Sequence, residues 1–424
     1  MKNPREVAVE IIRRFIEDNA WVTPLLRTYH SNFADIRDSE LMTELVYGTV
    51  KNFLKLRKIA NTYLNHGNFD FLRPIQQALL LVSIYELLYL TKIPEYATIH
   101  SYVEISKRLT NLQFSKLLNG LLRNIQRKIK IVEFEPYEEF SINKELFDYL
   151  RQKSDFDFLI AILTHSLQPH KVYLRCDDLT DNKPLSTEHS SKCGLENVIF
   201  PEAYLVKNSS SLTECSFCKN IIFQDLSTQI AQHLVPYVPR GTYLDLTSAP
   251  SLKSSFLAKR FSDVLVISND LNFKKIKKAK ESFVSHNHFF VCSDAQIPPF
   301  KKLFDVVILD PPCSGLGTLR RKPEIKIRMS PKTIKNLITL QENLLRSASD
   351  LTKPGGYLCY MTCTVNPEEN EEMVARFLKH RNDFIIGPIK SEEIEFIQRE
   401  YGVYIDGSKY DCDYFFISKL RRTK

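Results

Sequence analysis

From Gln224 onward the chain alternates short apolar runs with segments of helical pattern. The apolar runs that we predict as strands are Tyr243–Leu246, Val264–Ile267, Phe289–Cys292, Val306–Leu309 and Tyr357–Met361. This alternation indicates a doubly wound parallel sheet with helices on both faces. Because ligands bind at the carboxyl ends of the strands in such a sheet, the residues that follow these runs are the first candidates for a site.

The remainder of the chain divides into two further parts. Residues 1–132 have apolar side chains at spacings of three and four, which predicts an all-α domain. Residues 133–223 combine a helical stretch with short strands and polar loops, and we predict a small α+β linker module there. The sheet domain then covers residues 224–424. The predicted fold class is therefore α/β, with an all-α N-terminal domain and a Rossmann-like doubly wound sheet at the C-terminal end.

Charge and apolar content limit the possible partners. The net charge is +8, and residues 1–130 carry 19 Lys and Arg against 12 Asp and Glu, so a polyanion is expected to bind the helical domain. The longest apolar stretch, residues 78–90, is too short to span a bilayer and contains Glu86. The N-terminus lacks the apolar core of a secretory signal. We expect a cytoplasmic protein without membrane contact, and a monomer.

Two cysteines directly follow predicted strands. Cys313 lies in the run DPPCSG that begins at Asp310, and Cys363 lies in the run MTCTVNPEEN. A thiolate is well suited to adding to an electron-poor pyrimidine ring, because it is intrinsically nucleophilic and forms near neutral pH. The two motifs predict covalent chemistry on a nucleic-acid base. The competing interpretation is that both are small buried apolar residues, as most buried cysteines are.

Acidic residues end the first three strands of the predicted sheet. Asp245 precedes a turn that continues through Ala249 and Pro250 to Lys253, while Asp270 and Asp294 follow the next two strands. A carboxylate at such a position can accept hydrogen bonds from two ribose hydroxyls, whereas it would repel the phosphates of a dinucleotide. The ordered set favours a nucleoside-bearing cofactor, although each residue alone could be a solvated loop carboxylate.

Several longer runs carry a family resemblance: Gln224–Gln229, Asp310–Arg328, Thr362–Asn370 and Asp413–Phe416. In these the chain resembles the bacterial RNA cytosine-C5 methyltransferases of the RsmB/Fmu/Sun type. Residues 44–50 and 118–123 resemble the NusB-type RNA-binding domain that is fused to these enzymes. The resemblance implies S-adenosylmethionine as cofactor, small-subunit (16S) ribosomal RNA as partner, and 5-methylcytosine as product.

The resemblance also implies roles for individual residues. Cys363 would be the nucleophile that adds to C6 of the cytosine, Cys313 would assist release of the methylated base, and Asp310 would hydrogen-bond the cytosine edge. The cofactor would be held by Asp245, Ala249, Pro250, Lys253, Asp270, Asp294 and Asp310. The basic run Arg320, Arg321 and Lys322 would contact the RNA backbone, although it could equally be an ordinary solvated loop.

One loop departs from the family pattern. The family reads Ala-Pro-Gly-Gly-Lys-Thr where this chain has Ala249-Pro250-Ser251-Leu252-Lys253-Ser254. Glycines allow a positive φ and a close approach of the backbone to the cofactor. The replacement of both glycines leaves three interpretations open. The chain could bind the cofactor more weakly, could rearrange this loop, or could be a non-catalytic RNA-binding or assembly factor. An exocyclic-amine methyltransferase is a further alternative, because its Asp-Pro-Pro-aromatic motif is similar except at Cys313.

The nine cysteines do not resemble a disulfide framework, because they are odd in number and lie mostly in apolar runs. Cys215 and Cys218 have the spacing of a zinc-binding pair, with Cys193 and His189 nearby in the sequence. A single pair without a second is weak evidence for zinc. We expect structural thiols and no metal.

Overall fold

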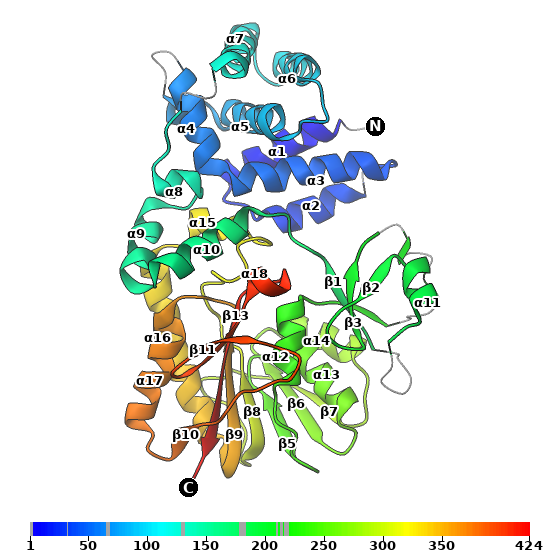
Figure 1. Ribbon diagram of the computed structural model, residues 1–424, viewed down its shortest axis with the longest axis vertical. Coiled ribbons are helices and arrows are strands. Elements are labelled where there is room, and N and C mark those ends of the chain that lie inside the picture. Colours follow the sequence, from blue (N-terminus) through cyan, green and yellow to red (C-terminus); the bar gives the residue numbers. More distant parts are fainter. Residues whose placement is uncertain are drawn as a thin grey trace. The chain divides into compact units, whose positions relative to one another are not determined.

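The structure is a computed structural model that describes residues 3–31, 33–64, 68–128, 132–177, 184–208, 211–212, 215 and 220–424 (Figure 1). The chain forms two compact units. The first comprises Met1–Tyr149 together with Lys322–Ser330, and the second comprises Leu150–Arg321 together with Pro331–Lys424. The division into three domains at residues 132 and 223 stays a prediction.

The first unit is helical, as the sequence predicted. Its helices are α1 Pro4–Glu17, α2 Val22–His30, α3 Ile36–Lys51, α4 Phe53–Tyr63, α5 Pro74–Tyr89, α6 Glu95–Leu109, α7 Leu112–Lys128 and α8 Pro136–Glu139, with α9 Lys144–Lys153 beginning at its end and a short 3-10 helix, Phe69–Phe71. Helix α5 is the apolar stretch noted above, and its residues 78–86 are all buried. No helix in the described part of the chain is long and apolar enough to cross a membrane.

A buried carboxylate organises this helical core. Glu86 on α5 pairs with Arg5 of α1 at 2.7 Å. It also accepts hydrogen bonds from Thr98 Oγ1 at 3.0 Å and from Tyr102 Oη at 2.9 Å, both on α6. Because an unpaired buried charge is costly, these contacts explain how Glu86 is tolerated in an apolar run, and they connect three helices.

The segment Lys322–Ser330, which contains the short helix α15 Ile325–Arg328, packs into the first unit. Lys326 is fully buried, and its Nζ donates hydrogen bonds of 2.9 Å to the carbonyls of Lys51 and Phe140. The guanidinium of Arg328 donates to the carbonyl of Ala20 at 2.7 Å. Burial lowers the pKa of Lys326 to about 7. These contacts fix the segment to the helices.

The second unit contains a nine-stranded sheet within its described residues. Its strands are β5 Thr242–Asp245, β6 Leu265–Asp270, β7 His288–Cys292, β8 Phe304–Leu309, β9 Thr352–Thr362, β10 Phe384–Ile386, β11 Phe396–Arg399, β12 Gly402–Ile405 and β13 Phe415–Arg422. The order is β11-β12-β13-β9-β8-β5-β6-β7, with β10 paired to β13. Strands β5 to β9 are parallel and correspond to the five predicted runs, while β10 to β13 pair antiparallel.

Helices cover both faces of this sheet (Figure 1). On one side lie α12 Leu226–His233, α13 Leu252–Arg260 and α14 Phe273–Ser282, and on the other lie α16 Pro331–Asp350 and α17 Glu371–His380. The unit also includes α10 Phe156–Leu167, α18 Gly407–Tyr410 and the 3-10 helix Pro367–Glu369. The two coverings confirm the doubly wound α/β architecture that the alternating pattern predicted.

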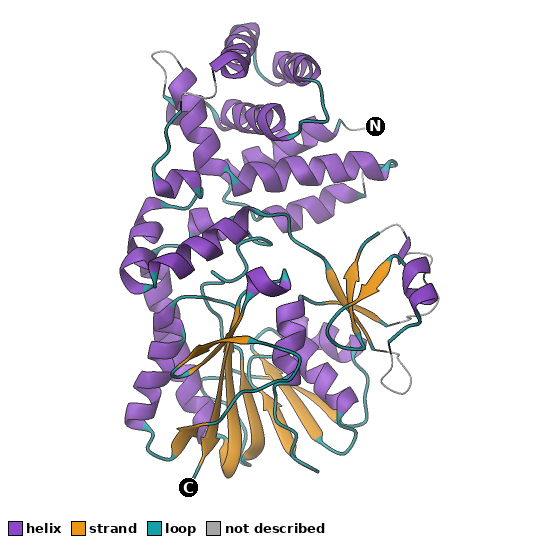
Figure 2. Cartoon of the chain, viewed as in Figure 1, coloured by secondary structure: helices purple, strands orange, loops and turns teal. Residues whose placement is uncertain are grey.

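A second, smaller sheet precedes the large one in the chain (Figure 2). Its strands are β1 Tyr173–Cys176, β2 Leu195–Asn197, β3 Ala203–Val206 and β4 Ile221–Phe223, with the antiparallel order β2-β3-β1-β4. The short helix α11 Thr187–Lys192 precedes β2. This sheet has its own apolar core, which includes Leu174 and Tyr204.

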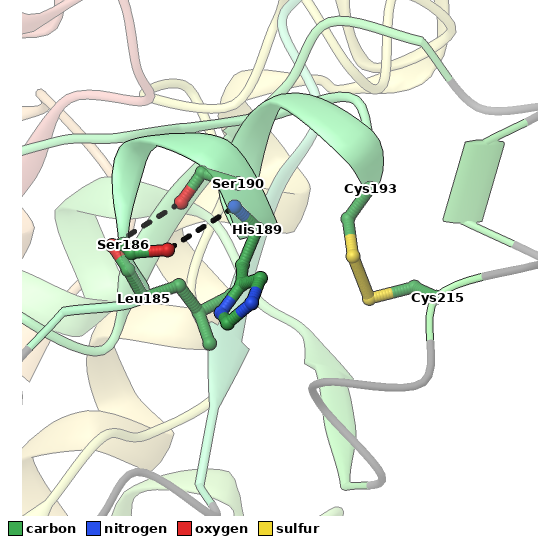
Figure 3. The surroundings of a disulfide bond; sticks show 6 residues. All are labelled: Leu185, Ser186, His189, Ser190, Cys193 and Cys215. Carbon is green, nitrogen blue, oxygen red and sulfur yellow. Dashed lines mark hydrogen bonds between the residues drawn. A yellow bond between two sulfur atoms is a disulfide. The ribbon is translucent and has the colours of Figure 1, made fainter.

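The cysteines of this small sheet are bonded, contrary to the prediction of free thiols. Cys193, directly after α11, forms a disulfide with Cys215 (Figure 3), and Cys176 is also disulfide-bonded. All three contribute to the same small core, because the fold brings β1, α11 and the loop before β4 together. Cys218 lies outside the described residues. Among the residues that are described, no group of three His, Cys, Asp or Glu could hold a metal ion.

Candidate active site

The two motif cysteines meet at the carboxyl end of the sheet. Cys313 follows β8 and Cys363 follows β9, and these strands are parallel neighbours whose last residues stay in register, with Leu309 opposite Tyr360. The two Sγ atoms lie 3.2 Å apart. Both side chains are half-buried. The parallel sheet thus brings together two thiols that are 50 residues apart in the sequence.

Electrostatics distinguish the two thiols. The hydrogen bond to Cys363, together with burial, raises the pKa of Cys313 well above its ordinary value. This shift favours the protonated form of Cys313, although either sulfur of the pair can act as the donor. A thiolate is stabilised by a neighbouring proton donor and by a nearby cation, so this arrangement favours Cys363 as the nucleophile.

That cation is Lys253 on α13. Its Nζ lies 2.5 Å from Oδ2 of Asp310, the carboxylate at the end of β8. Burial disfavours the charged form of Lys253, but the charges of Asp310 and Asp245 outweigh this effect and raise its pKa. Cys363 also raises the pKa of Lys253, so this side chain stays positively charged near Asp310 and Cys363.

Asp245 at the end of β5 has one unused acceptor. Its Oδ2 accepts a hydrogen bond of 2.6 Å from the Ser254 hydroxyl, but its buried Oδ1 has no hydrogen-bond partner among the described residues. Burial raises the pKa of Asp245 to about 6. An unpaired buried carboxylate oxygen is costly, and an ammonium group of a ligand would satisfy it.

The loop between β5 and α13 carries Ser251 and Leu252, where the family that the chain resembles has two glycines. Ser251 has a φ of 64°, in the left-handed region that favours glycine. Its N–H donates to the Ser248 carbonyl at 2.6 Å, and the two hydroxyls lie 3.1 Å apart. Leu252 begins α13 with ordinary helical geometry. Of the two residues that stand where the family has glycine, only Ser251 therefore has a strained backbone conformation.

The other two acidic strand ends differ from each other. Asp270 accepts hydrogen bonds from the backbone N–H groups of Ala249 at 3.0 Å and Asn272 at 2.8 Å, so it anchors the loop after β5. Asp294 is exposed, and its carboxylate accepts a hydrogen bond of 2.8 Å from the Gln296 N–H. Since β5, β6 and β7 are adjacent and parallel, the predicted carboxylates share one edge of the sheet.

The buried Asn269 was not singled out by the sequence. Its side-chain amide donates to the carbonyls of Leu246 at 3.0 Å and Ser293 at 3.2 Å, and so connects the loops that follow β5 and β7. Its position directly before the strand-end carboxylate Asp270 was the sequence feature that could have indicated this role.

Glu369 is a second residue that the sequence did not single out. Its fully buried carboxylate accepts hydrogen bonds from the backbone N–H of Ser314 at 2.9 Å and from Gln341 Nε2 at 2.9 Å. It also accepts from Asn366 Nδ2 at 3.1 Å. One carboxylate thus joins the loop of Cys313 to the loop of Cys363. Its position inside the PEEN run was the available signal, but the run alone did not reveal which residue faces inward.

Gly317 keeps the loop after Cys313 close to Cys363. Its N–H donates to the Cys363 carbonyl at 2.9 Å, and its carbonyl accepts from the Tyr414 N–H at 3.0 Å. A Cβ atom at this position would lie 2.2 Å from the backbone oxygen of Tyr414. No residue other than glycine fits here without moving the backbone.

The basic run after Cys313 is used largely inside the protein. Arg320 is only 4% exposed, and its guanidinium pairs with Asp411 at 2.7 Å and hydrogen-bonds His165 at 3.0 Å. Arg321 pairs with Asp413 at 2.5 Å, and only Lys322 is exposed. Contact of this run with the RNA backbone stays a prediction, and the exposed Lys322 is the residue of the run that is most accessible for it. The sequence could not show the burial of Arg320, because its acidic partner lies far along the chain.

Comparison with protein families gives two matches. Residues 232–421 match the family described as 16S rRNA methyltransferase RsmB/F, and residues 2–127 match the NusB family. The chain is 28% identical over 442 residues to the "Probable ribosomal RNA small subunit methyltransferase B" of Bacillus subtilis (strain 168), covering 99% of this chain and 98% of that protein. It is 26% identical to the "Ribosomal RNA small subunit methyltransferase B" of Cronobacter sakazakii, with 99% and 98% covered.

Solved structures share the fold. "Crystal Structure of PH0851" superposes with a TM-score of 0.80 at 21% identity, covering 100% of this chain and 99% of that one. "The crystal structure of NSun6 from Pyrococcus horikoshii with SFG" has a TM-score of 0.55 at 16% identity, with coverages of 66% and 98%. At these identities the likeness establishes the architecture alone.

Proposed function

We propose that this chain, whose residues 232–421 match the 16S rRNA methyltransferase RsmB/F family and whose residues 2–127 match the NusB family, methylates C5 of a cytosine in small-subunit ribosomal RNA. The observation that carries this proposal is the thiol pair of Cys313 and Cys363, whose sulfurs lie 3.2 Å apart at the ends of two parallel strands. Methylation of an exocyclic amine needs no such pair.

S-adenosylmethionine is the methyl donor, and the residues at the strand ends fit it. The unpaired Oδ1 of Asp245 suits an ammonium group, and carboxylates such as Asp270 and Asp294 suit ribose hydroxyls. When bound, the cofactor supplies an electrophilic methyl group on a sulfonium. Lys253 is already neutralised by Asp310, so it does not repel a cationic ligand strongly.

The chain's own residues supply the remaining chemistry. The thiolate of Cys363 adds to C6 of the cytosine, and the electron pair that moves to C5 makes this carbon nucleophilic enough to take the methyl group. Asp310 hydrogen-bonds the cytosine edge and holds a proton at N3, which eases the addition at C6. The base must be unpaired or flipped out of its stack, because a duplex hides both ring carbons.

Release of the product requires that a base such as solvent water take the C5 proton, that the electron pair of the C5–H bond form the C5–C6 double bond, and that the C6–S bond break. The electron pair of that bond returns to the sulfur of Cys363. Cys313 can give its proton to this sulfur, because it remains a thiol with a raised pKa at 3.2 Å. This division of labour assigns nucleophilic attack to one cysteine and assistance in release to the other.

The experiment that tests the proposal identifies the modified nucleoside. Purified protein is incubated with S-adenosylmethionine and unmodified small-subunit ribosomal RNA, and the digested RNA is analysed by mass spectrometry. The proposal expects 5-methylcytidine at one site. N4-methylcytidine would instead establish an exocyclic-amine enzyme, and binding of RNA without any methylation would establish a non-catalytic RNA-binding factor.

A further inference from the structure

Arg175 on β1 is the largest fully buried side chain in the described part of the protein. Its guanidinium pairs with Asp177, with Nε 2.5 Å from Oδ1, and donates to the side-chain carbonyls of Gln224 at 2.7 Å and Gln232 at 3.0 Å. Burying a charge is costly unless it is paired and hydrogen-bonded. A surface arginine would avoid that cost, so the burial of this one calls for a reason beyond packing.

The same guanidinium reaches the first turn of α13. Its Nη1 donates to the backbone carbonyl of Leu252 at 3.1 Å, and its Nη2 donates to the hydroxyl of Ser255 at 3.3 Å. The Ser255 hydroxyl in turn donates to the same Leu252 carbonyl at 3.0 Å. The ring of Phe256 lies below the guanidinium at 5.2 Å. A strand of the small sheet thus holds the start of the helix that follows the loop at the end of β5.

The carbonyl that Arg175 holds belongs to the peptide group that links Leu252 to Lys253. Lys253 is the residue whose Nζ lies 2.5 Å from Asp310. The contacts therefore continue from Asp177 through Arg175 and this peptide group to Lys253 and Asp310. They connect the small sheet to the carboxylate at the end of β8.

The geometry points to Arg175 as a positioning residue that fixes the first turn of α13, and hence Lys253, for binding of S-adenosylmethionine. This inference rests on the proposed function, because it assumes that the loop at the end of β5 holds the cofactor. The small sheet is then part of the cofactor site rather than a separate module. Such support matters in this chain, since Ser251 directly before α13 holds a left-handed backbone without being glycine.

A purely structural role for Arg175 makes a different prediction. In that case its loss lowers stability, because Gln224 and Gln232 each lose the hydrogen bond from the guanidinium, but the protein that remains folded binds the cofactor normally. Arg381 is a matched control. Its guanidinium is also paired, with Asp383 at 2.8 Å and Asp350 at 2.7 Å, but it makes no contact with α13.

The test compares Arg175→Met and Arg175→Lys with Arg381→Met in the full chain. Calorimetry measures the affinity for S-adenosylmethionine, filter binding measures the affinity for RNA, and thermal unfolding reports stability. We expect Arg175→Met to weaken cofactor binding about tenfold, as for a lost hydrogen bond from a charged group, and Arg175→Lys to restore part of this loss. RNA affinity stays unchanged, and Arg381→Met lowers the melting temperature without changing cofactor affinity.

A milder variant decides the question if Arg175→Met does not fold. Ser255→Ala removes one of the two α13 groups that the guanidinium contacts, and leaves the charge paired. We expect Ser255→Ala to weaken cofactor binding. In the double variant with Arg175→Lys, the fold-loss of affinity should be smaller than the product of the two single fold-losses, because both side chains act on the same Leu252 carbonyl. Wild-type affinity in both Arg175→Lys and Ser255→Ala would overturn the inference.

A measurement without cofactor separates failure of this inference from failure of the proposed function. If the wild-type protein binds no S-adenosylmethionine, the proposed function fails, whatever the variants do. Amide hydrogen exchange then still reports on Arg175, because a positioning role requires faster exchange at residues 252–256 in Arg175→Lys but not in Arg381→Met. Unchanged exchange in that segment would contradict the positioning role.

Discussion

Glu369 accepts a hydrogen bond of 2.9 Å from the backbone N–H of Ser314, so a fully buried carboxylate lies between the loops of the two motif cysteines. The distance between Cys313 and Cys363 is therefore not set by the ends of β8 and β9 alone. The carboxylate also holds Gln341 of α16, whose side-chain amide donates to the Pro312 carbonyl at 2.9 Å. The loop geometry depends on a residue that touches neither thiol.

Removing this carboxylate is expected to impair activity through the geometry of the thiols. Glu369→Ala leaves the donors of Ser314, Gln341 and Asn366 unsatisfied inside the protein, which costs about 2–4 kcal/mol of stability. Glu369→Gln keeps the volume but replaces one acceptor with a donor, and we expect kcat to fall more than tenfold, as for a misplaced reactive group, while KM for RNA changes little. Steady-state kinetics and urea unfolding test this. Glu372→Gln, an exposed neighbour, is the control.

The cysteine roles predict opposite outcomes for two similar substitutions. Cys363→Ala removes the nucleophile, so methyl transfer and any covalent complex with RNA are both lost. Cys313→Ala leaves the nucleophile but removes the proton donor at 3.2 Å, so a protein–RNA adduct that survives denaturation accumulates. Denaturing electrophoresis with labelled RNA distinguishes the two. Cys292→Ala, at an exposed free cysteine, keeps full activity, and adduct-free loss in both motif variants would contradict the assignment.

The parallel strands and the positions of both cysteines could be predicted from the sequence, because each strand is a continuous apolar run followed by a chemically distinctive residue. Strands β10 to β13 could not, since they are antiparallel additions, and a run such as Phe396–Arg399 shows no clear apolar pattern. The small sheet was anticipated as an α+β module, but its disulfide was not. Pairing of Cys193 with Cys215 depends on contacts between distant segments.

The candidate site was predicted unevenly for the same physical reason. Asp245 and Asp270 belong to strands whose ends are visible in the sequence, so their common edge follows from the parallel order. The roles of Arg175 and Glu369 arise from partners on other elements, and no local pattern indicates them. Arg320 illustrates the same limit, because the sequence shows a basic run but does not show that the guanidinium of Arg320 pairs with Asp411.

The left-handed backbone at Ser251 predicts which residues this loop tolerates. Ser251→Gly removes the steric cost of a φ of 64° but adds unfolded-state entropy and loses the contact with the Ser248 hydroxyl, so stability changes by less than about 1 kcal/mol. Ser251→Val places a β-branched side chain at positive φ and costs about 2 kcal/mol or more. Thermal unfolding and calorimetric titration with S-adenosylmethionine check both variants. Equal stability of the glycine and valine variants would show that the loop does not require this backbone conformation.

The buried Lys326 predicts a pH dependence of stability. Burial lowers the pKa of its ammonium group to about 7 in the folded protein, whereas the unfolded chain has the ordinary lysine value of about 10. Between these values the unfolded state binds more protons, so the free energy of unfolding rises with pH by up to about 1.4 kcal/mol per unit. Below about pH 7 both states are protonated, and this contribution becomes constant at its least favourable value.

Urea unfolding at pH 7, 8 and 9 measures the rise in the free energy of unfolding. Lys326→Met removes it, although the variant also loses the donors to the Lys51 and Phe140 carbonyls, while the exposed neighbour Lys322→Met keeps it. An identical slope in Lys326→Met and the wild type would place the titrating group elsewhere.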